Sequence, residues 1–321
     1  YTSWFSLPYL RLPGVRSVER YDAVVFSFPP GDTIFVDKEL AGHDYYGILR
    51  REGIRAAGGD IEKFALNPEQ YMRIVREKAF IKPGLSARPI DKKENYVKRC
   101  IGLPGDSLSV IDRQVFINGE AIANPEHLQY EYQVQFSSPM KAKKAMKMLG
   151  LTNVDIGASQ ATSDGISTLI SLTNSEVETL RNSGAAKSLD LMSTLNRKGR
   201  MDIFPNSYRE EFNEWTPDDL GPIYIPKAGR TIELNERNLD MYRRAISAYE
   251  HHDLVEKPDG TVEIDGKAVT TYTFEQDYYW MMGDNRHRSA DSRMWGFVPE
   301  DHVIGRASFT WFSKQNVPQH G

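Results

Sequence analysis

The sequence predicts a mainly β protein with α-helical parts, in which a β-sheet core is interrupted by a large α-rich insertion. Runs of β-branched and aromatic residues, which favour strands, lie towards the two ends of the chain. In the N-terminal part they occupy residues 21–28 and lie within 96–117. Between the end regions, apolar residues recur with helical spacing. We therefore expect residues 1–136 and 253–321 to form one β core, and residues 137–252 to form an inserted α-rich subdomain.

Two strand segments and a helix are expected in the N-terminal region. The strand pattern at 21–28 ends in a Pro-Pro-Gly-Asp turn at 29–32 and resumes at 33–36. Asn67 followed by Pro68 is typical of a helix start, because an Asn side chain accepts hydrogen bonds from the free N–H groups of the first turn and Pro fits that turn.

Hairpin turns separate the later strand segments. Strands are expected within 96–117, and the strand pattern returns at 261–264 and again at 302–312. Asn-Gly at 118–119 and Asp-Gly at 265–266 are hairpin signals, because a type I′ turn needs positive φ at both central residues.

Three helices are expected inside the insertion. Residues 140–149 and 173–182 each show a helical pattern that ends close to a glycine. Leu239, Tyr242 and Ile246 recur at steps of three and four, which is the spacing of an amphipathic helix.

Composition argues against several kinds of partner. The chain has 40 Lys and Arg against 44 Asp and Glu, and no basic block stands out, so we expect no nucleic-acid partner. No apolar run approaches the roughly 20 residues of a membrane-spanning helix. Cys100 is the single cysteine, which rules out an internal disulfide, and the seven histidines lack ligand spacing. We expect neither a metal nor another cofactor.

The segment at 283–296 crowds charges of both signs directly after an aromatic-rich strand pattern. Taken alone, such a segment is most often a solvated loop. A calcium loop is the next interpretation, but the alternating Asp series that such loops use is absent.

Lys98 lies in a second unusual segment, 96–106. On a strand, Lys98 and Cys100 share one face. A lysine in such a run is usually an edge-strand charge that discourages aggregation. The alternative is a lysine against an apolar wall, where desolvation lowers the pKa of the amine and lets it act as a base. From this segment alone, the edge-strand interpretation is favoured.

Three segments together resemble the sequence boxes of type I signal peptidases. Residues 98–106 match Lys-Arg-x-x-Gly-x-Pro-Gly-Asp. Residues 283–296 match Gly-Asp-Asn-Arg-x-x-Ser-x-Asp-Ser-Arg-x-Trp-Gly at every specified position. Residues 20–26 resemble an Arg-Gly-Asp-hydrophobic strand, with Tyr21 where Gly is usual. The boxes cover a small part of the chain, but they agree in order and content.

The resemblance implies a mostly β, signal-peptidase-like catalytic core that uses a Ser/Lys dyad to cut signal peptides from exported preproteins. Lys98 would be the general base, and Ser289 would hydrogen-bond the Lys98 amine and orient it. The protein would act at the bacterial inner membrane, on its periplasmic face.

The resemblance also implies contacts that support the site and a mode of substrate binding. By position, Asp291 would pair with Arg293, and Asp284 would pair with Arg99. A signal peptide would add as a strand beside the Lys98 strand, with shallow pockets that admit an Ala-x-Ala pattern.

The chain departs from the family at the nucleophile. The family's serine lies in Pro-Ser-x-Ser-Met, between a membrane anchor and the Arg-Gly-Asp strand, and no Ser-Met dipeptide occurs here. Ser3, Ser6 and Ser17 precede Arg20 without that context. Cys100 is disfavoured as a substitute, because an unpaired Cys in an apolar run usually behaves as a small buried hydrophobe. We expect that the chain begins after the anchor and the nucleophile box and is inactive by itself.

Two other functions compete with this interpretation. A latent self-cleaving repressor uses the same chemistry on a similar fold, but it would need a helix-turn-helix module, which we do not find. A peptide-binding module of the same fold that has lost its serine would capture exported peptides by strand addition.

Overall fold

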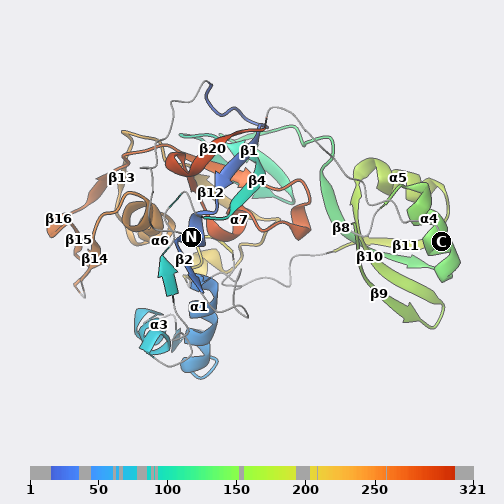
Figure 1. The fold of residues 1–321 in the computed structure, drawn as a ribbon, viewed down its shortest axis with the longest axis horizontal. Helices are drawn as coiled ribbons and strands as arrows, with labels where there is room; N and C mark the ends of the chain where they lie inside the picture. The colour runs from blue at the N-terminus through green and yellow to red at the C-terminus, as the bar shows by residue number, and fades with distance from the viewer. Residues whose placement is uncertain are drawn as a thin grey trace, which may run out of the picture.

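A computed structural model describes residues 16–35, 45–60, 63–64, 68–77, 85–87, 90, 93–151, 155–192, 203–207, 209–257 and 259–307. The fold is mainly β with α-helices, as the sequence predicts (Figure 1). Among the described residues, the three largest sheets have five, four and four strands.

A five-stranded antiparallel sheet joins the two end regions of the chain, in the order β19-β18-β4-β1-β20. Its strands are β1 (Ala23–Ser27), β4 (Asn95–Gly102), β18 (Tyr278–Met282), β19 (Val298–Pro299) and β20 (Val303–Arg306). β4 is the central strand, with β1 on one side and β18 on the other.

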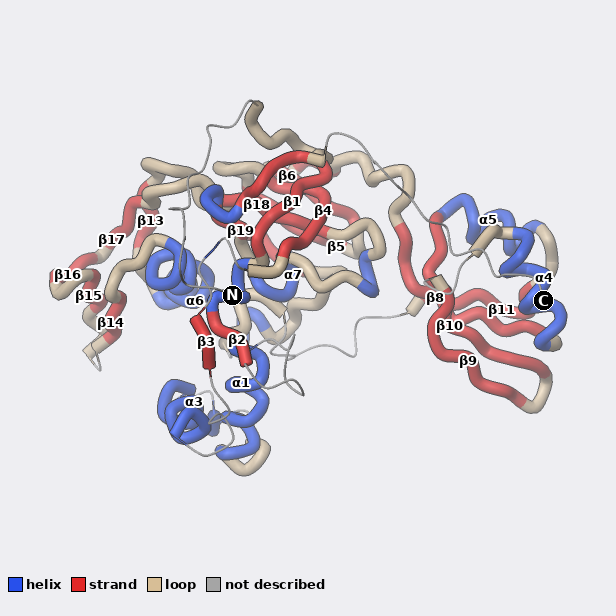
Figure 2. Tube along the Cα trace, in the orientation of Figure 1, coloured by secondary structure: helices blue, strands red, loops and turns tan. Residues whose placement is uncertain are grey.

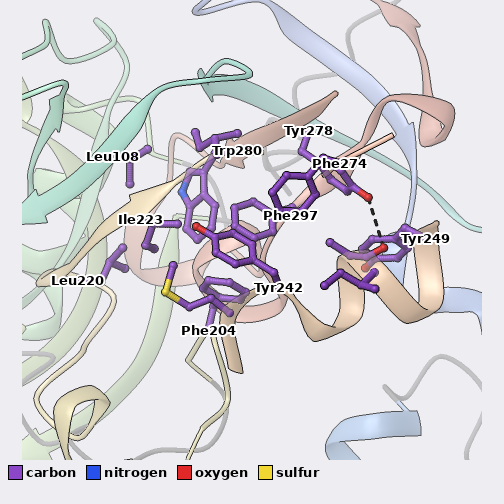
Figure 3. Packing of buried hydrophobic residues seen from close by; sticks show 14 of the residues in the cluster. Leu108, Phe204, Leu220, Ile223, Tyr242, Tyr249, Phe274, Tyr278, Trp280 and Phe297 are labelled. Atoms are coloured by element: carbon purple, nitrogen blue, oxygen red, sulfur yellow. Dashed lines mark hydrogen bonds between the residues drawn. The ribbon is translucent and has the colours of Figure 1, made fainter. Parts of the chain in front are cut away.

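Apolar clusters cover both faces of β18, and every residue of this strand is buried. Tyr278 and Trp280 face the larger cluster, in which the Trp280 ring packs edge-on against Phe297 with 5.8 Å between ring centroids (Figure 3). Tyr279 and Met281 belong to the smaller cluster on the opposite face. Burial on both sides fixes the strand that leads into the charged segment.

A second antiparallel sheet supplies part of the larger cluster, in the order β12-β5-β6-β7. Its strands are β5 (Ser107–Ile111), β6 (Gln114–Ile117), β7 (Glu120–Ala121) and β12 (Leu220–Tyr224). The expected turn joins β6 to β7, with φ of 54° at Asn118 and 86° at Gly119.

Residues 129–191 form a separate unit, at the right of Figure 1, with an apolar core of its own. Its elements are β8 (Gln129–Phe136), α4 (Pro139–Met148), β9 (Ile156–Thr162), β10 (Gly165–Thr173), α5 (Asn174–Asn182) and β11 (Ala186–Leu191). The sheet order β11-β8-β10-β9 and the chain order β-α-β-β-α-β make this a ferredoxin-like arrangement.

The structure therefore differs from the α-rich insertion expected at 137–252. The separate unit begins earlier, at β8, and combines four strands with two helices. Residues 220–224 belong to the core, because this strand, β12, pairs with β5 and buries Ile223 in the larger cluster. α6 (Glu236–Arg244) and the helical turn Ala245–Tyr249 also pack there. The three helical patterns were predicted correctly, but two of the helices serve the insertion and one serves the core.

Apart from the short helix α7 (Ser292–Trp295) of the charged segment, the remaining helices and strands lie at the periphery (Figure 2). They are β2 (Thr33–Phe35), α1 (Tyr45–Ala56), α3 (Pro68–Glu77), β3 (Leu85–Ala87), β13 (Thr231–Glu233), β14 (Leu254–Glu256), β15 (Val262–Ile264), β16 (Lys267–Val269) and β17 (Thr271–Thr273). α3 begins at Pro68, as the Asn-Pro pair predicts. None of the helices within the described ranges is long and apolar enough to span a membrane.

Candidate active site

β4 places Lys98 beside the smaller apolar cluster. Lys98 lies across from Val24 of β1, next to the buried Cys100 on the same strand face. The Lys98 side chain is half-buried, so it is not the solvated edge-strand charge that the first interpretation describes. On its second side, β4 pairs with β18 from Arg99 onwards, so the residue after β18, Gly283, comes to lie beside the Lys98 amine.

The Lys98 amine contacts Ser289. Nζ donates a hydrogen bond to the Ser289 Oγ at 2.9 Å, so the contact expected from the two boxes is present. The charged segment turns back after β18 and brings Ser289 over Gly283. A Cβ on Gly283 would lie 2.7 Å from the Ser289 Cβ and 3.4 Å from the Lys98 Nζ, so only glycine leaves room for this contact.

Burial lowers the pKa of the Lys98 amine below its ordinary range. The Asp291 carboxylate opposes this effect, the Arg293 guanidinium adds to it, and Asp284 opposes it weakly. A lysine with a lowered pKa carries a free lone pair at a pH where an exposed lysine is protonated. The direction of this shift is the one that a lysine general base requires.

Asp291 and Arg293 hold the returning segment in place. Both side chains are buried, and the Asp291 carboxylate accepts hydrogen bonds from the Arg293 Nε at 2.9 Å and Nη2 at 2.8 Å. It also accepts one from the Gly283 N–H at 2.9 Å, which ties it to the end of β18. Burial raises the pKa of Asp291, but the Arg293 charge and the hydrogen bonds from Arg293, Gly283 and Ser289 outweigh burial and lower it.

Arg99 and Asp284 form the second predicted pair. The Arg99 Nε and Nη2 bind the two Asp284 carboxylate oxygens at 2.8 and 2.6 Å. The Arg99 Nη1 also donates to the Tyr21 carbonyl oxygen at 2.8 Å. Tyr21 has a φ of 73°, a conformation that favours glycine, which explains why Gly is usual at this position.

Sequence reasoning missed a third ion pair, which joins two of the boxes. The Arg20 Nη2 lies 2.9 Å from Asp106 Oδ2, and the same Asp106 oxygen accepts a hydrogen bond from the Leu103 N–H at 2.7 Å. The signal was available, because Arg20 and Asp106 each occupy a specified box position.

His287 was also missed, and it connects the charged segment to the insertion. Its Nε2 lies 3.1 Å from the Asp218 Oδ2, and its Nδ1 accepts a hydrogen bond from the Glu131 N–H at 3.3 Å. The Nδ1 contact places the ring proton on Nε2, where it donates to the carboxylate. His287 occupies an unspecified position of its box, and its partners come from segments without a motif, so no sequence signal pointed to it.

The structure does not support Cys100 as a substitute nucleophile. Cys100 is fully buried, and burial raises the pKa of its thiol to about 12, so the thiolate is not available. Ser17 is exposed, and Ser3 and Ser6 lie outside the described residues. Within the described ranges, no three His, Cys, Asp or Glu side chains gather as metal ligands would.

The family model for signal peptidase, peptidase S26, matches residues 6–158 and 225–312. The match includes both parts of the site around Lys98 and Ser289. It leaves out residues 159–224, which contain β10, α5 and β11 of the insertion as well as β12 of the core.

Curated relatives match shorter stretches. Signal peptidase I of Haemophilus influenzae is 32% identical over 101 residues, which are 31% of this chain and 26% of that protein. Signal peptidase I of Buchnera aphidicola subsp. Schizaphis graminum is 60% identical over 48 residues, 15% of each chain. Probable signal peptidase I-1 of Synechocystis sp. is 32% identical over 116 residues, 32% of this chain and 50% of that protein. The chain thus spans half or less of the length of these relatives.

Proposed function

The chain belongs to the signal peptidase family, peptidase S26, and from this premise we propose that it is the catalytic part of a serine endopeptidase that removes N-terminal signal peptides from exported preproteins. The observation that supports this most directly is the 2.9 Å contact between the Lys98 Nζ and the Ser289 Oγ, at a lysine whose pKa is lowered by burial. Lys98 is the proposed general base and Ser289 the residue that orients it.

The proposed reaction is an acyl transfer in two steps. Neutral Lys98 takes the proton of a serine hydroxyl while the serine oxygen attacks the carbonyl carbon of the scissile peptide bond. The lysine gives this proton to the leaving amine as the C–N bond breaks, which leaves an acyl ester on the serine. The same amine then takes a proton from a water molecule that attacks the ester, and returns it to the serine oxygen as the C–O bond breaks.

Two ion pairs support this chemistry by position. Asp291 and Arg293 hold the segment that presents Ser289, and Arg99 with Asp284 fixes the residue next to Lys98 against the start of the same segment. A base that works in its neutral form has to stay in a fixed, partly dry place, and paired charges around it prevent the segment from moving away.

We identify no nucleophile among the described residues around Lys98. The sequence contains no Ser-Met dipeptide, and we propose that a serine of the Pro-Ser-x-Ser-Met kind comes from a segment other than residues 1–321. The printed chain by itself is therefore proposed to be inactive, because a base without its nucleophile leaves only residual catalysis. The membrane anchor, at the periplasmic face of the bacterial inner membrane, is proposed to be supplied in the same way.

The substrate is proposed to pair with the first half of β4. β18 pairs with β4 from Arg99 onwards, so the β18 side of residues 95–98 meets no strand within the described ranges. An extended signal peptide added there would run directly past the Lys98 amine, with its main chain held by strand hydrogen bonds.

A fusion protein tests the function. A membrane-anchored segment that contains Pro-Ser-x-Ser-Met, taken from a signal peptidase, is joined before residue 1. We expect the fusion to cut a preprotein after an Ala-x-Ala sequence, and Lys98→Met to reduce the rate by roughly 100-fold or more. Lys227→Met, at an exposed lysine, is the matched control and should keep the activity. Binding of signal peptides without any cleavage by the fusion would favour the peptide-binding module instead.

A protein of residues 1–321 alone is sufficient to test the protonation of Lys98. Acetic anhydride reacts with the unprotonated amine, so the pH dependence of labelling, followed by peptide mass spectrometry, reports the pKa of each lysine. We expect Lys98 to become reactive at lower pH than the exposed Lys227, because burial lowers its pKa. In the active fusion, the rate should rise with pH through the same pKa. Equal labelling midpoints for the two lysines would argue against the proposed base.

A further inference from the structure

Helix α4 of the insertion is strongly basic, whereas the chain as a whole has a negative net charge. The chain has a formal net charge of −4, yet the ten residues of α4 include Lys141, Lys143, Lys144 and Lys147 and no acidic residue. Ala142, Ala145 and Met146 interrupt these lysines, so the sequence shows no continuous basic block. The helix gathers them on its outer side.

The fold of α4 exposes methionines among these lysines. Ala142 and Ala145 are buried and attach the helix to the core of the insertion. On the opposite side, Met140, Lys144 and Met148 follow at steps of four and form one row along the helix. Met140 is 81% exposed and Met148 is 50% exposed. The outer face of α4 is therefore basic and apolar at once.

The charge of this face is not neutralised within the described structure. None of the four lysines forms an ion pair with a described residue. The neighbouring helix α5 adds one exposed acid, Glu178, and one exposed base, Arg181, while its Glu176 side chain caps the start of its own helix. The two helices together thus present a clear excess of positive charge.

We propose that the outer face of α4 docks on a membrane surface that contains anionic lipids. Lysines on a helix are attracted to anionic headgroups, and apolar side chains between them can enter the boundary between headgroups and acyl chains. Methionine side chains are flexible and apolar, so their transfer from water into the membrane boundary lowers the free energy. A polyanion such as nucleic acid would use the lysines but would leave both methionines in water. The proposal goes beyond the peptidase function and does not depend on the reaction at Lys98.

Vesicle flotation of the printed chain tests the proposal. Vesicles of phosphatidylcholine alone are compared with vesicles that also contain phosphatidylglycerol, at low and high salt. We expect binding to the anionic vesicles only, weakened by salt because the attraction is electrostatic. Loss of a lysine near an anionic surface weakens binding about fivefold, so Lys144→Gln with Lys147→Gln should weaken it about 25-fold.

Two further variants separate this surface from general charge effects. Lys227→Gln with Lys267→Gln removes the same charge from exposed lysines outside the insertion and should leave vesicle binding unchanged. Met140→Ser with Met148→Ser should weaken binding while its dependence on salt persists. Unchanged thermal unfolding would show that each variant is folded, since all six positions are exposed.

Three results would overturn the proposal. The first is the absence of binding to anionic vesicles. The second is an equal loss of binding in the α4 lysine variant and the core lysine variant. The third is α4-dependent binding to double-stranded DNA without binding to vesicles, which would assign the surface to nucleic acid.

Discussion

Gly283 lies where the end of β18 passes beneath the contact between Lys98 and Ser289. Its N–H donates to Asp291, and the space that a side chain would fill is occupied by Ser289. Because glycine has no side chain, it leaves this space to Ser289. The effect of adding a side chain can be measured without a cleavage assay.

Gly283→Ala is expected to push the returning segment away from β4. The added methyl group would clash with Ser289, and overpacking of this kind costs about 1–3 kcal/mol of unfolding free energy. The Lys98 pKa should rise, because a displaced Ser289 lets water reach the amine. Urea unfolding and the pH dependence of Lys98 acetylation measure the two effects. Gly305→Ala is the matched control, since a Cβ there meets no atom within 4 Å. Equal behaviour of the two variants would contradict this account.

At the scale of residues, every contact that the sequence predicted joins two box residues, although the Arg20–Asp106 pair, which also joins two boxes, was missed. Lys98 with Ser289 and Arg99 with Asp284 are among the predicted contacts. His287 could not be predicted, because its role depends on Asp218, which the fold brings to it from a segment without any motif. Such contacts are set by tertiary structure rather than by local pattern.

At the scale of elements, strand β8 is bound directly to the charged segment. The Gln129 N–H donates to the Asp284 carbonyl oxygen at 2.9 Å, and the Glu131 N–H donates to the His287 ring at 3.3 Å. The Tyr130 ring meets the His287 ring edge-on, with 5.1 Å between centroids. The first strand of the insertion therefore supports the segment that presents Ser289.

His287→Ala should loosen this attachment. The Glu131 N–H loses its acceptor, and the buried Asp218 carboxylate loses one of its donors, a combination that costs about 1–3 kcal/mol. Hydrogen exchange should become faster at the Glu131 amide, while the centre of β18 stays protected. His127→Ala, at an exposed histidine of the same connection, should change neither quantity. Unchanged exchange at Glu131 in His287→Ala would show that the attachment does not depend on the ring.

The strands of the insertion differ in how clearly the sequence pattern predicts them. β8 alternates polar and apolar residues, and its apolar members Tyr130, Tyr132, Val134 and Phe136 are all buried, so this strand could have been predicted. β9 could not, because it is an exposed sheet edge built of small and polar residues and lacks a hydrophobic pattern. The α-rich expectation arose because helices in this region have clear patterns and its edge strands do not.

At the scale of the whole molecule, the insertion has a core of its own, apart from the clusters around β18. Buried residues from its sheet and from both helices pack together, and none of them belongs to the other clusters. A fragment that contains only this unit, residues 126–192, is near the lower limit of length for independent folding.

Residues 126–192 alone should fold and unfold cooperatively. Circular dichroism during heating measures this, and Val134→Ala should lower the unfolding free energy by about 1–3 kcal/mol because Val134 is fully buried. Gln133→Ala, at the exposed neighbouring position, should leave the transition nearly unchanged. A fragment without a cooperative transition would mean that the insertion needs the core in order to fold.

The path of the chain through the insertion bears on how such a protein can change during evolution. β8 and β11 are antiparallel neighbours, and the Met192 N–H donates to the Glu131 carbonyl oxygen at 2.9 Å, so the chain enters and leaves this unit on two adjacent strands. A module with adjacent ends can be acquired, exchanged or lost without pulling its host apart. Exchange of the parts of this unit beyond β8 would leave in place the contacts of β8 with the charged segment, and with them the support of Ser289.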